Sequence, residues 1–280
     1  MPYSAEISRT NPSCFLFVVD QSASMEDMFG ADGETKAKAD GVADAINRLL
    51  QDLVIKCAKS EGVRDYYHIG VIGYGADVGP AFSGDLLGQD IVPVSEIAEH
   101  PARVEERVRK VDDGAGGLVE QTVKFPIWFD ATANGGTPMC AAFTLAQDIL
   151  GNWLDEHPKA FPPVVIHITD GESTDGDPTE MMQKLRSMQT KDGNVLLFNV
   201  HLSDNPNAQT LSFPDDVQEL PDQYAQTLFQ GSSPLTPFMR RVAGELGFDV
   251  SDETRGFVLN ADLPLVVQAL EIGTRPSNLR

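Results

Sequence analysis

An uninterrupted apolar run that stops at an acidic residue constrains the fold of this chain most. Every residue from Phe15 to Val19 is apolar, and Asp20, Ser22 and Ser24 follow the run directly. A run without polar alternation is typical of a strand buried on both faces, and such strands occur almost only in parallel sheets covered by helices. In these sheets, ligands bind beyond the carboxyl ends of the strands, where the strand order reverses. The run therefore predicts an α/β fold with a ligand site next to Asp20.

The three polar residues after this run are hard oxygen donors. One carboxylate and two hydroxyls suit Mg²⁺ or Mn²⁺ better than zinc, which prefers nitrogen and sulfur. The spacing alone is not specific, because Asp and Ser are also common in turns. The pattern is therefore weak without matching donors elsewhere in the chain.

Two later stretches place further oxygen donors at the ends of expected elements. In Gly135-Gly136-Thr137-Pro138, the threonine precedes an apolar stripe typical of a helix, so a helix N-cap is the alternative to a ligand role. The two glycines let the backbone turn tightly beside a ligand, and a capping hydroxyl keeps spare lone pairs. A second apolar run ends at Asp170, where a plain Asx turn is the alternative.

Taken together, these three stretches resemble the metal-ion-dependent adhesion site of von Willebrand factor A domains. The resemblance runs from about Cys14 to about Gly273. It implies a doubly wound, Rossmann-like α/β fold, with a mostly parallel central sheet of about six strands in the order 3-2-1-4-5-6 and helices on both faces. It also implies a bound Mg²⁺, with Mn²⁺ or Ca²⁺ as alternatives. The metal-site residues that it implies are Asp20, Ser22, Ser24, Thr137 and Asp170.

The same resemblance assigns roles to the site residues. In the family, the hydroxyls corresponding to Ser22, Ser24 and Thr137 coordinate the metal directly, and the two aspartates act through waters or accept hydrogen bonds from the hydroxyls. A metal with neutral direct ligands keeps much of its charge, so an incoming carboxylate can take its open position. The rim that meets the partner is expected to contain Gln21, Gly136 and Glu172.

Three functions remain open at this point. We expect a protein-binding module that captures an Asp or Glu of a partner through the metal. Family analogy suggests an AAA+ ATPase or a kinase–phosphatase system as that partner. The alternatives are a metal-dependent phosphohydrolase and a scaffold with a purely structural metal. An enzyme is not expected, because the sequence has no phosphate-binding loop and His167, the histidine nearest the motifs, lies in a buried apolar run.

The charge balance disfavours two classes of partner. The chain carries 42 acidic and 21 basic residues, a formal net charge of −21. Nucleic acids and anionic membranes both bind clustered cations, so neither is expected as a partner. The N-terminus is polar, and no apolar run approaches the ~20 residues that span a membrane. With three scattered cysteines, these features predict a cytoplasmic protein with reduced thiols.

The chain is expected to form one domain. Residues 1–13 are expected as a lead-in, 14–273 as the domain and 274–280 as a tail. Residues 76–130 are the least regular part, and we expect them to be an elaboration between the core strands, near the metal rim.

Hydrophobic periodicity predicts several individual elements. Apolar residues at three- and four-residue spacing predict a helix from Glu34 to Lys59, with Lys38 on its charged outer face. Alternating Glu and Arg predict a solvated helix from Ser95 to Val111, broken or started near Pro101. Leu118 to Phe129 is expected to be an edge strand or hairpin arm. The stretch from Ser203 to Gly231 is expected to be a polar loop.

Overall fold

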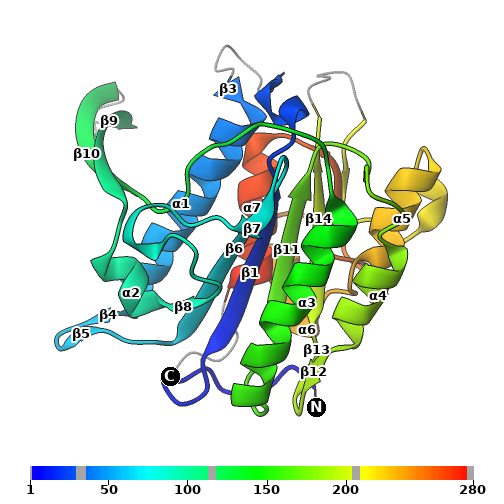
Figure 1. Cartoon of the computed structure of the whole chain (residues 1–280), viewed down its shortest axis with the longest axis horizontal. Coiled ribbons are helices and arrows are strands. Elements are labelled where there is room, and N and C mark those ends of the chain that lie inside the picture. The colour runs from blue at the N-terminus through cyan, green and yellow to red at the C-terminus, as the bar shows by residue number, and fades with distance from the viewer. Residues whose placement is uncertain (1, 30–35, 113–117, 204–208, 276–280) are drawn as a thin grey trace.

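The computed structural model describes residues 2–29, 36–112, 118–203 and 209–275 of the 280-residue chain (Figure 1). Its centre is a mostly parallel sheet with helices on both faces. Within the described residues the sheet has eight strands in the order β15-β16-β14-β11-β1-β6-β7, with β8 paired to β6. These strands are β1 (Ser13–Asp20), β6 (Tyr67–Tyr74), β7 (Val78–Pro80), β8 (Val92–Pro93), β11 (Val164–Thr169), β14 (Leu196–Leu202), β15 (Leu211–Ser212) and β16 (Phe257–Ala261).

The sheet confirms the expected fold class and the strand order that the resemblance implied. β1 pairs in parallel with β6 on one side and with β11 on the other, so the strand order reverses at β1. β14 and β16 continue the parallel run, whereas β7, β8 and β15 are antiparallel additions. The strand that corresponds to number 3 in the order 3-2-1-4-5-6 is β7. It lies in a Gly-rich stretch without a strand pattern.

Alternate side chains of β1 enter two separate cores. Phe15 and Phe17 pack in the core below α1, α2, α6 and α7, whereas Leu16 and Val18 pack against α3, α4 and α5 on the opposite face. All residues of β1 are buried, which is why its sequence shows no polar alternation. The helices are α1 (Lys38–Cys57), α2 (Val94–Glu99), α3 (Met139–Glu156), α4 (Thr179–Ser187), α5 (Gln223–Gly231), α6 (Pro237–Glu245) and α7 (Leu263–Thr274).

Short elements complete the described chain, and none of its helices combines the length and apolar character needed to cross a membrane. These elements are η1 (Ala23–Glu26), η2 (Gly84–Leu86), η3 (Val217–Glu219), β2 (Met28–Phe29), β3 (Lys36–Ala37), β4 (Ala58–Lys59), β5 (Gly62–Val63), β12 (Gln189–Thr190) and β13 (Gly193–Asn194).

The stretch expected as a polar loop, Ser203 to Gly231, is ordered in large part. Residues 204–208 lie outside the described residues, but β15, η3 and α5 occupy much of the remainder. The Asp222 side chain caps α5 by accepting a hydrogen bond from the Ala225 N–H, and Leu228 is buried on the same helix. The expectation of a loop is therefore wrong here, because a short capped helix buries an apolar face that the surrounding polar residues obscure.

The helix expected from Ser95 to Val111, broken or started near Pro101, forms only before that break, and its expected continuation is wrong. Only α2 is helical there, and the chain continues as β9 (Arg103–Asp112), which pairs in antiparallel register with β10 (Leu118–Ile127). Leu118 to Phe129 was expected as an edge strand or hairpin arm, and the hairpin arm is confirmed. The hairpin β9–β10 lies outside the central sheet and projects beside α1 (Figure 1).

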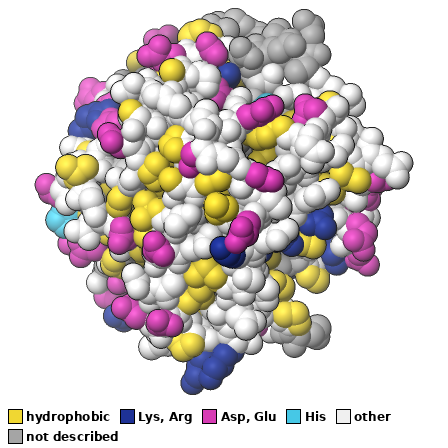
Figure 2. Space-filling model, turned by 45° about the vertical axis from the view of Figure 1, so that its right-hand side comes forward, with side chains coloured by type: hydrophobic (Ala, Val, Ile, Leu, Met, Phe, Trp, Pro, Cys, Tyr) yellow, Lys and Arg dark blue, Asp and Glu magenta, His cyan; other side chains and the backbone are white. Residues whose placement is uncertain are grey.

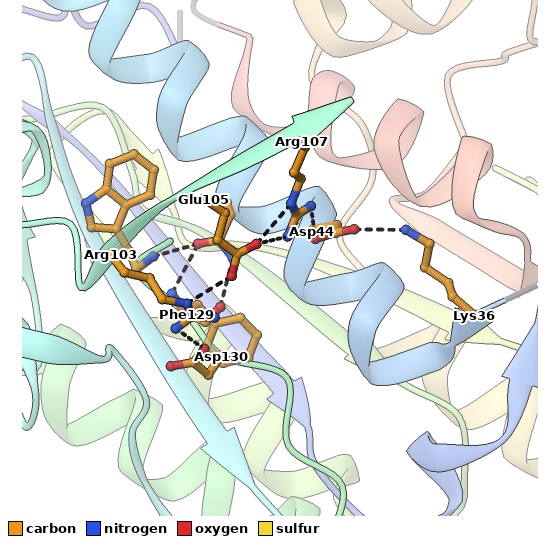
Figure 3. Close-up of polar contacts among 9 residues, drawn as sticks. Lys36, Asp44, Arg103, Glu105, Arg107, Phe129 and Asp130 are labelled. Carbon is orange, nitrogen blue, oxygen red and sulfur yellow. Dashed lines mark hydrogen bonds and ion pairs between the residues drawn. The ribbon is translucent and has the colours of Figure 1, made fainter. Parts of the chain in front are cut away.

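Charges that alternate along β9 explain why a strand forms. Arg103, Glu105 and Arg107 lie two residues apart, so they share one face of the strand and pair with one another (Figure 3). Arg107 also reaches α1, where it contacts Asp44 at 2.7 Å, and Lys36 contacts the other oxygen of Asp44 at 2.8 Å. Ion pairs between residues two apart fit a strand, because residues i and i+2 do not face each other on a helix.

A single buried amide fixes the end of this hairpin. Asn47 of α1 is 1% exposed, and its Nδ2 donates to the Phe129 carbonyl at 2.8 Å. Its Oδ1 accepts from the backbone N–H groups of Trp128 at 2.8 Å and Phe129 at 3.1 Å. Asn47 thereby pairs three backbone groups of the segment after β10, which also forms an antiparallel bridge between Phe129 and Phe82.

Replacing Asn47 with Ala should destabilise the protein strongly. The change removes the partner of three buried backbone groups, and each unsatisfied group costs about 1–3 kcal/mol, so the free energy of unfolding should fall by about 3 kcal/mol or more. Urea denaturation measures this. Arg48→Ala, at the exposed next position, should change the same quantity by less than about 0.5 kcal/mol. An equally small effect for Asn47→Ala would contradict this role.

Candidate functional site

Three loops meet beyond the carboxyl ends of β1 and β11. The first follows β1 and contains η1, the second leads into α3, and the third follows β11. Backbone hydrogen bonds join the first two loops. The Asn134 N–H donates to the Gln21 carbonyl at 2.6 Å, and the Ala23 N–H donates to the Gly135 carbonyl at 3.1 Å. These loops therefore form one hydrogen-bonded unit at the point where the strand order reverses.

Two glycines allow this close approach. A Cβ on Gly75 would lie 2.5 Å from the carbonyl oxygens of Asn134 and Gln21. A Cβ on Gly135 would lie 2.4 Å from the backbone nitrogen of Ala76, and Gly135 has a φ of +84° that other residues rarely adopt. The expectation that Gly135 provides a tight turn at the site is confirmed.

Four of the five expected metal residues form one chain of hydrogen bonds. Asp20 accepts from the Ser22 N–H at 2.8 Å through Oδ1 and from the Thr169 hydroxyl at 2.7 Å through Oδ2. The hydroxyls of Ser22 and Ser24 lie 3.0 Å apart, and the Ser24 hydroxyl donates to Asp170 Oδ1 at 2.8 Å. The structure thus brings these residues together, while their role as metal ligands stays a prediction.

The fifth residue, Thr137, lies beside this chain. It is 5% exposed, and its Oγ1 lies 3.9 Å from the position of a Cβ on Gly171. Its backbone N–H donates to Thr174 Oγ1 at 3.0 Å. The alternative role as helix cap is wrong, because the N-cap of α3 is Pro138 and the Asp175 carboxylate accepts the next backbone N–H groups. The Thr137 hydroxyl therefore has no capping role to fulfil.

Sequence reasoning missed Lys38 of this site, as well as Thr169, whose hydroxyl donates to Asp20. The Lys38 ammonium lies 2.9 Å from Asp170 Oδ2, and only 4% of the lysine side chain is exposed. The expectation of a solvated outer face is therefore wrong for Lys38. The sequence did contain a signal for the burial of Lys38. The residue lies four positions before Val42 and eight before Ile46, so it shares a helix face with these buried residues. Removing one partner of such a buried pair costs about 3–5 kcal/mol.

The expected rim residues surround these side chains. Gly136 and Glu172 are exposed, and Gln21 is half-buried with its amide packed over Gly73. Gln21 also lines a groove of about 270 Å³ that extends to Asp130. One of the three expected rim residues therefore adjoins a groove of mixed polar and apolar lining.

The electrostatics of Asp20 favour a cation at the site. Asp20 is 1% exposed, and burial raises the pKa of its carboxyl, although hydrogen bonds from Ser22 and Thr169 lower it. The charged carboxylate is thus incompletely compensated by the protein, and a nearby cation would stabilise it.

The donor set fits a hard divalent ion. Two carboxylates and three hydroxyls are the oxygen ligands that Mg²⁺ accepts. In the part of the chain that the structure describes, no group of three or more His, Cys, Asp or Glu could hold a metal. Hydroxyls make up most of the donors here, so Ser22, Ser24 and Thr137 would complete the coordination together with the aspartates.

His167 takes part in a separate interior network. Its Nε2 lies 2.6 Å from the Tyr74 hydroxyl, and its Nδ1 lies 2.8 Å from Asn199 Oδ1. The Asn199 Nδ2 donates to the Leu228 carbonyl and to Ser232, which leaves its Oδ1 to accept from the histidine. Burial lowers the pKa of His167 to about 4. This histidine is therefore a neutral core residue, as its position in an apolar run predicted.

Comparison with known proteins adds a likeness in fold. No protein-family model and no curated protein matches the chain. Among solved structures it is similar to the vWF domain of the type V pili tip protein Mfa5 from Porphyromonas gingivalis, with 16% identity, 58% of this chain and 39% of that chain covered, and a TM-score of 0.33. It is also similar to the ArnB paralog VWA2 from Sulfolobus acidocaldarius, with 15% identity, 71% and 36% covered, and a TM-score of 0.34.

A third similar structure is the pilus adhesin RrgA from Streptococcus pneumoniae, with 14% identity, 60% of this chain and 21% of that chain covered, and a TM-score of 0.31. The chain therefore spans between 21% and 39% of the length of these three structures. No statement about function follows from this likeness.

Replacing Asp20 with Asn should stabilise the metal-free protein and abolish its response to metal. Folding raises the pKa of the Asp20 carboxyl, so the protein loses stability as the pH rises from the carboxyl's pKa in the unfolded chain through its pKa in the folded chain. A neutral amide avoids this loss at pH 7. In EDTA, the Tm of Asp20→Asn should exceed that of the wild type, and Mg²⁺ should no longer raise it.

The control for this prediction is Asp52→Asn, at an exposed position of α1. It should keep the wild-type Tm in EDTA and the wild-type response to Mg²⁺. Thermal unfolding with and without Mg²⁺ measures both quantities. A wild-type Mg²⁺ response in Asp20→Asn would show that this carboxylate does not serve the metal.

The buried imidazole of His167 should make the protein sensitive to mild acid. In the unfolded chain histidine takes up a proton near pH 6.5, but folded His167 does so only near pH 4. The unfolded state therefore gains protons between these values, and the free energy of unfolding should fall by about 3 kcal/mol as pH drops through this window.

Urea denaturation at pH 7 and pH 5 measures this effect. His167→Gln should lose less stability between the two pH values than the wild type, because it has no imidazole to protonate. His100→Gln, whose side chain is 37% exposed, should follow the wild type. Equal losses in all three proteins would contradict the assignment.

Proposed function

We propose that this protein is a divalent-metal-dependent protein-binding module of the von Willebrand A type. Mg²⁺, with Mn²⁺ or Ca²⁺ as alternatives, would bridge the site and an Asp or Glu of a partner protein. The observation that supports this proposal is the chain of hydrogen bonds from Asp20 to Asp170, with Thr137 beside it, where the strand order reverses. The residues that would hold the metal are Asp20, Ser22, Ser24, Thr137 and Asp170.

The burial of these residues suits capture of a ligand from solvent. Asp20 and Ser22 are 1% and 2% exposed, so they form the floor of the site. Ser24 is exposed, as is Gly136 on the neighbouring loop, so the site opens on this side. When bound, the metal supplies a positive charge with an open coordination position, to which a carboxylate is the natural ligand. The protein's side chains orient that position and leave it accessible.

The surface charge bears on the kind of partner. Figure 2 shows Asp and Glu side chains scattered over one face of the molecule with few Lys or Arg among them, in line with the net charge of −21. A partner that presents an acidic residue within a basic surface would be attracted at long range and bridged at short range. We propose such a partner, by family analogy a component of an AAA+ ATPase or kinase–phosphatase system.

A cytoplasmic location is part of the same proposal. The three cysteines, Cys14, Cys57 and Cys140, are unpaired and buried. Reduced, buried thiols behave as small apolar side chains and are stable where the redox poise is reducing.

Removing single hydroxyls should weaken metal binding without unfolding the protein. Calorimetric titration should show that wild-type protein binds Mg²⁺, and that Ser22→Ala and Thr137→Ala each bind it about 10–100-fold more weakly, the usual effect of removing a metal-site interaction. Ser233→Ala removes an equally buried hydroxyl, which accepts from the Leu197 N–H, and should keep the wild-type affinity. Absence of Mg²⁺ binding by the wild type would overturn the proposal.

A second measurement separates the binding function from the two alternatives. Protein partners from the native cell extract should be retained with Mg²⁺ and released by EDTA, and Thr137→Ala should retain none. Turnover of p-nitrophenyl phosphate that Asp20→Asn abolishes would instead support a phosphohydrolase. A Mg²⁺-dependent rise in Tm without any metal-dependent partner would support a scaffold with a structural metal.

A further inference from the structure

Lys38 places an ammonium group in contact with Asp170 of the candidate metal site. Its Nζ lies 2.9 Å from Asp170 Oδ2, and 4% of the lysine side chain and 0% of the aspartate side chain are exposed. The other neighbouring acid, Asp27, lies 3.8 Å away and is 56% exposed. Because water and salt do not reach the Lys38–Asp170 contact, its electrostatic effect on a bound cation is large.

The fold holds this ammonium in place. Lys38 is the first residue of α1, and its backbone N–H donates to the Asp27 carbonyl at 3.0 Å. Asp170 is held from the other side, because its Oδ1 accepts from the Ser24 hydroxyl at 2.8 Å while Oδ2 accepts from Lys38. The lysine therefore shares a carboxylate with a residue expected to bind the metal, and both oxygens of that carboxylate are occupied.

The formal charges of the buried groups give this contact a consequence. Asp20 and Asp170 together carry two negative charges, which would cancel the charge of a divalent ion completely. Lys38 adds one positive charge, so the site with a divalent ion carries a net charge of plus one. A single carboxylate from a partner then restores neutrality in a desolvated site, where an uncompensated charge is costly.

We infer that the Lys38 ammonium determines what the site binds, an inference that rests on the proposed function. The ammonium competes with the metal for Asp170, and it makes the metal-loaded site selective for a carboxylate. Removing the charge of Lys38 should therefore have two opposite effects. The metal should bind more tightly, because the competing cation is gone. A carboxylate should bind the loaded site more weakly, because the positive charge that attracts it is gone.

The test compares the wild type with Lys38→Met, which keeps the length of the side chain without its charge. Calorimetry with Mg²⁺ should give an affinity about tenfold or more tighter for Lys38→Met, the scale expected for one buried charge in contact. Acetate serves as the carboxylate probe on protein loaded with Mn²⁺, and broadening of its methyl proton signal reports binding next to the paramagnetic ion. Lys38→Met should bind acetate about tenfold more weakly than the wild type.

Lys36→Met is the matched control. This lysine lies two positions away, pairs with Asp44 at 2.8 Å and is 38% exposed (Figure 3). It should leave both affinities at the wild-type values. Lys38→Arg keeps the charge, and should also leave the affinity for Mg²⁺ within about threefold of the wild type.

The outcomes distinguish this inference from the proposed function. If the wild type binds Mg²⁺ and Lys38→Met binds it equally or more weakly, the inference is wrong and the metal site stands. If the wild type binds no metal and Lys38→Met does, the competition between the ammonium and the metal is supported, but the proposed function and the carboxylate selectivity that depends on it both fail. If neither protein binds metal, both fail. If Lys38→Met binds Mg²⁺ more tightly but keeps the wild-type affinity for acetate, the selectivity for a carboxylate is overturned.

A measurement on the wild type covers a failure of Lys38→Met to fold. With ¹⁵N-labelled lysine, the buried Lys38 ammonium should give a slowly exchanging NMR signal in EDTA, which Lys38→Arg assigns by its loss. Saturation with Mg²⁺ should shift this signal and leave that of Lys36 unchanged. A Lys38 signal that does not shift on saturation with Mg²⁺ would overturn the inference.

Discussion

The parallel pairing of β1 with β11 is the constraint on which the site depends. Register matches Val19 with Ile168, so the two strands end at the same level and the polar residues that follow them emerge together. The pairing requires both strands to be buried on both faces, and helices on each side provide that burial. This arrangement is sufficient to bring Ser24 and Asp170 within hydrogen-bond distance of each other.

The candidate site buries charged side chains, and this burial contributes little to the stability of the fold. Asp170 has a buried ammonium as its partner, whereas Asp20 has only hydrogen-bond donors, and burial raises the pKa of its carboxyl. Such a carboxylate lowers the stability of the metal-free protein, a cost that recurs where residues are retained for binding rather than for folding. The two aspartates are thus unequal: Asp170 pairs with the Lys38 ammonium, whereas Asp20 accepts hydrogen bonds from a backbone N–H and a hydroxyl.

Away from the site, charges shape the fold rather than a binding surface. The hairpin β9–β10 belongs to no larger sheet, and isolated two-stranded hairpins are marginally stable in water. Here Arg107 pairs with Asp44 (Figure 3). Arg107 also lies over the ring of Phe125 at 3.9 Å, and Asn47 binds the backbone after β10. Contacts with α1 therefore replace the neighbouring strand that a hairpin in a sheet would have.

The pattern of residues along the chain was sufficient to predict a mostly parallel sheet with strands at β1 and β11, and to identify oxygen donors that the fold brings together, but it predicted no strand at β7 or β15. Burial on both faces, strand ends and glycine turns are local signals, and β1, β11 and the Gly135 turn formed where those signals lie. Packing in three dimensions decided the remainder, because it depends on which residues meet from distant segments. Lys38 is buried against a carboxylate 132 positions away, and Arg107 of β9 pairs with Asp44 of another element. Long-range electrostatic pairing has no signature in a local period, so the place of the lysine became visible only from the contact between the first residue of α1 and the loop after β11.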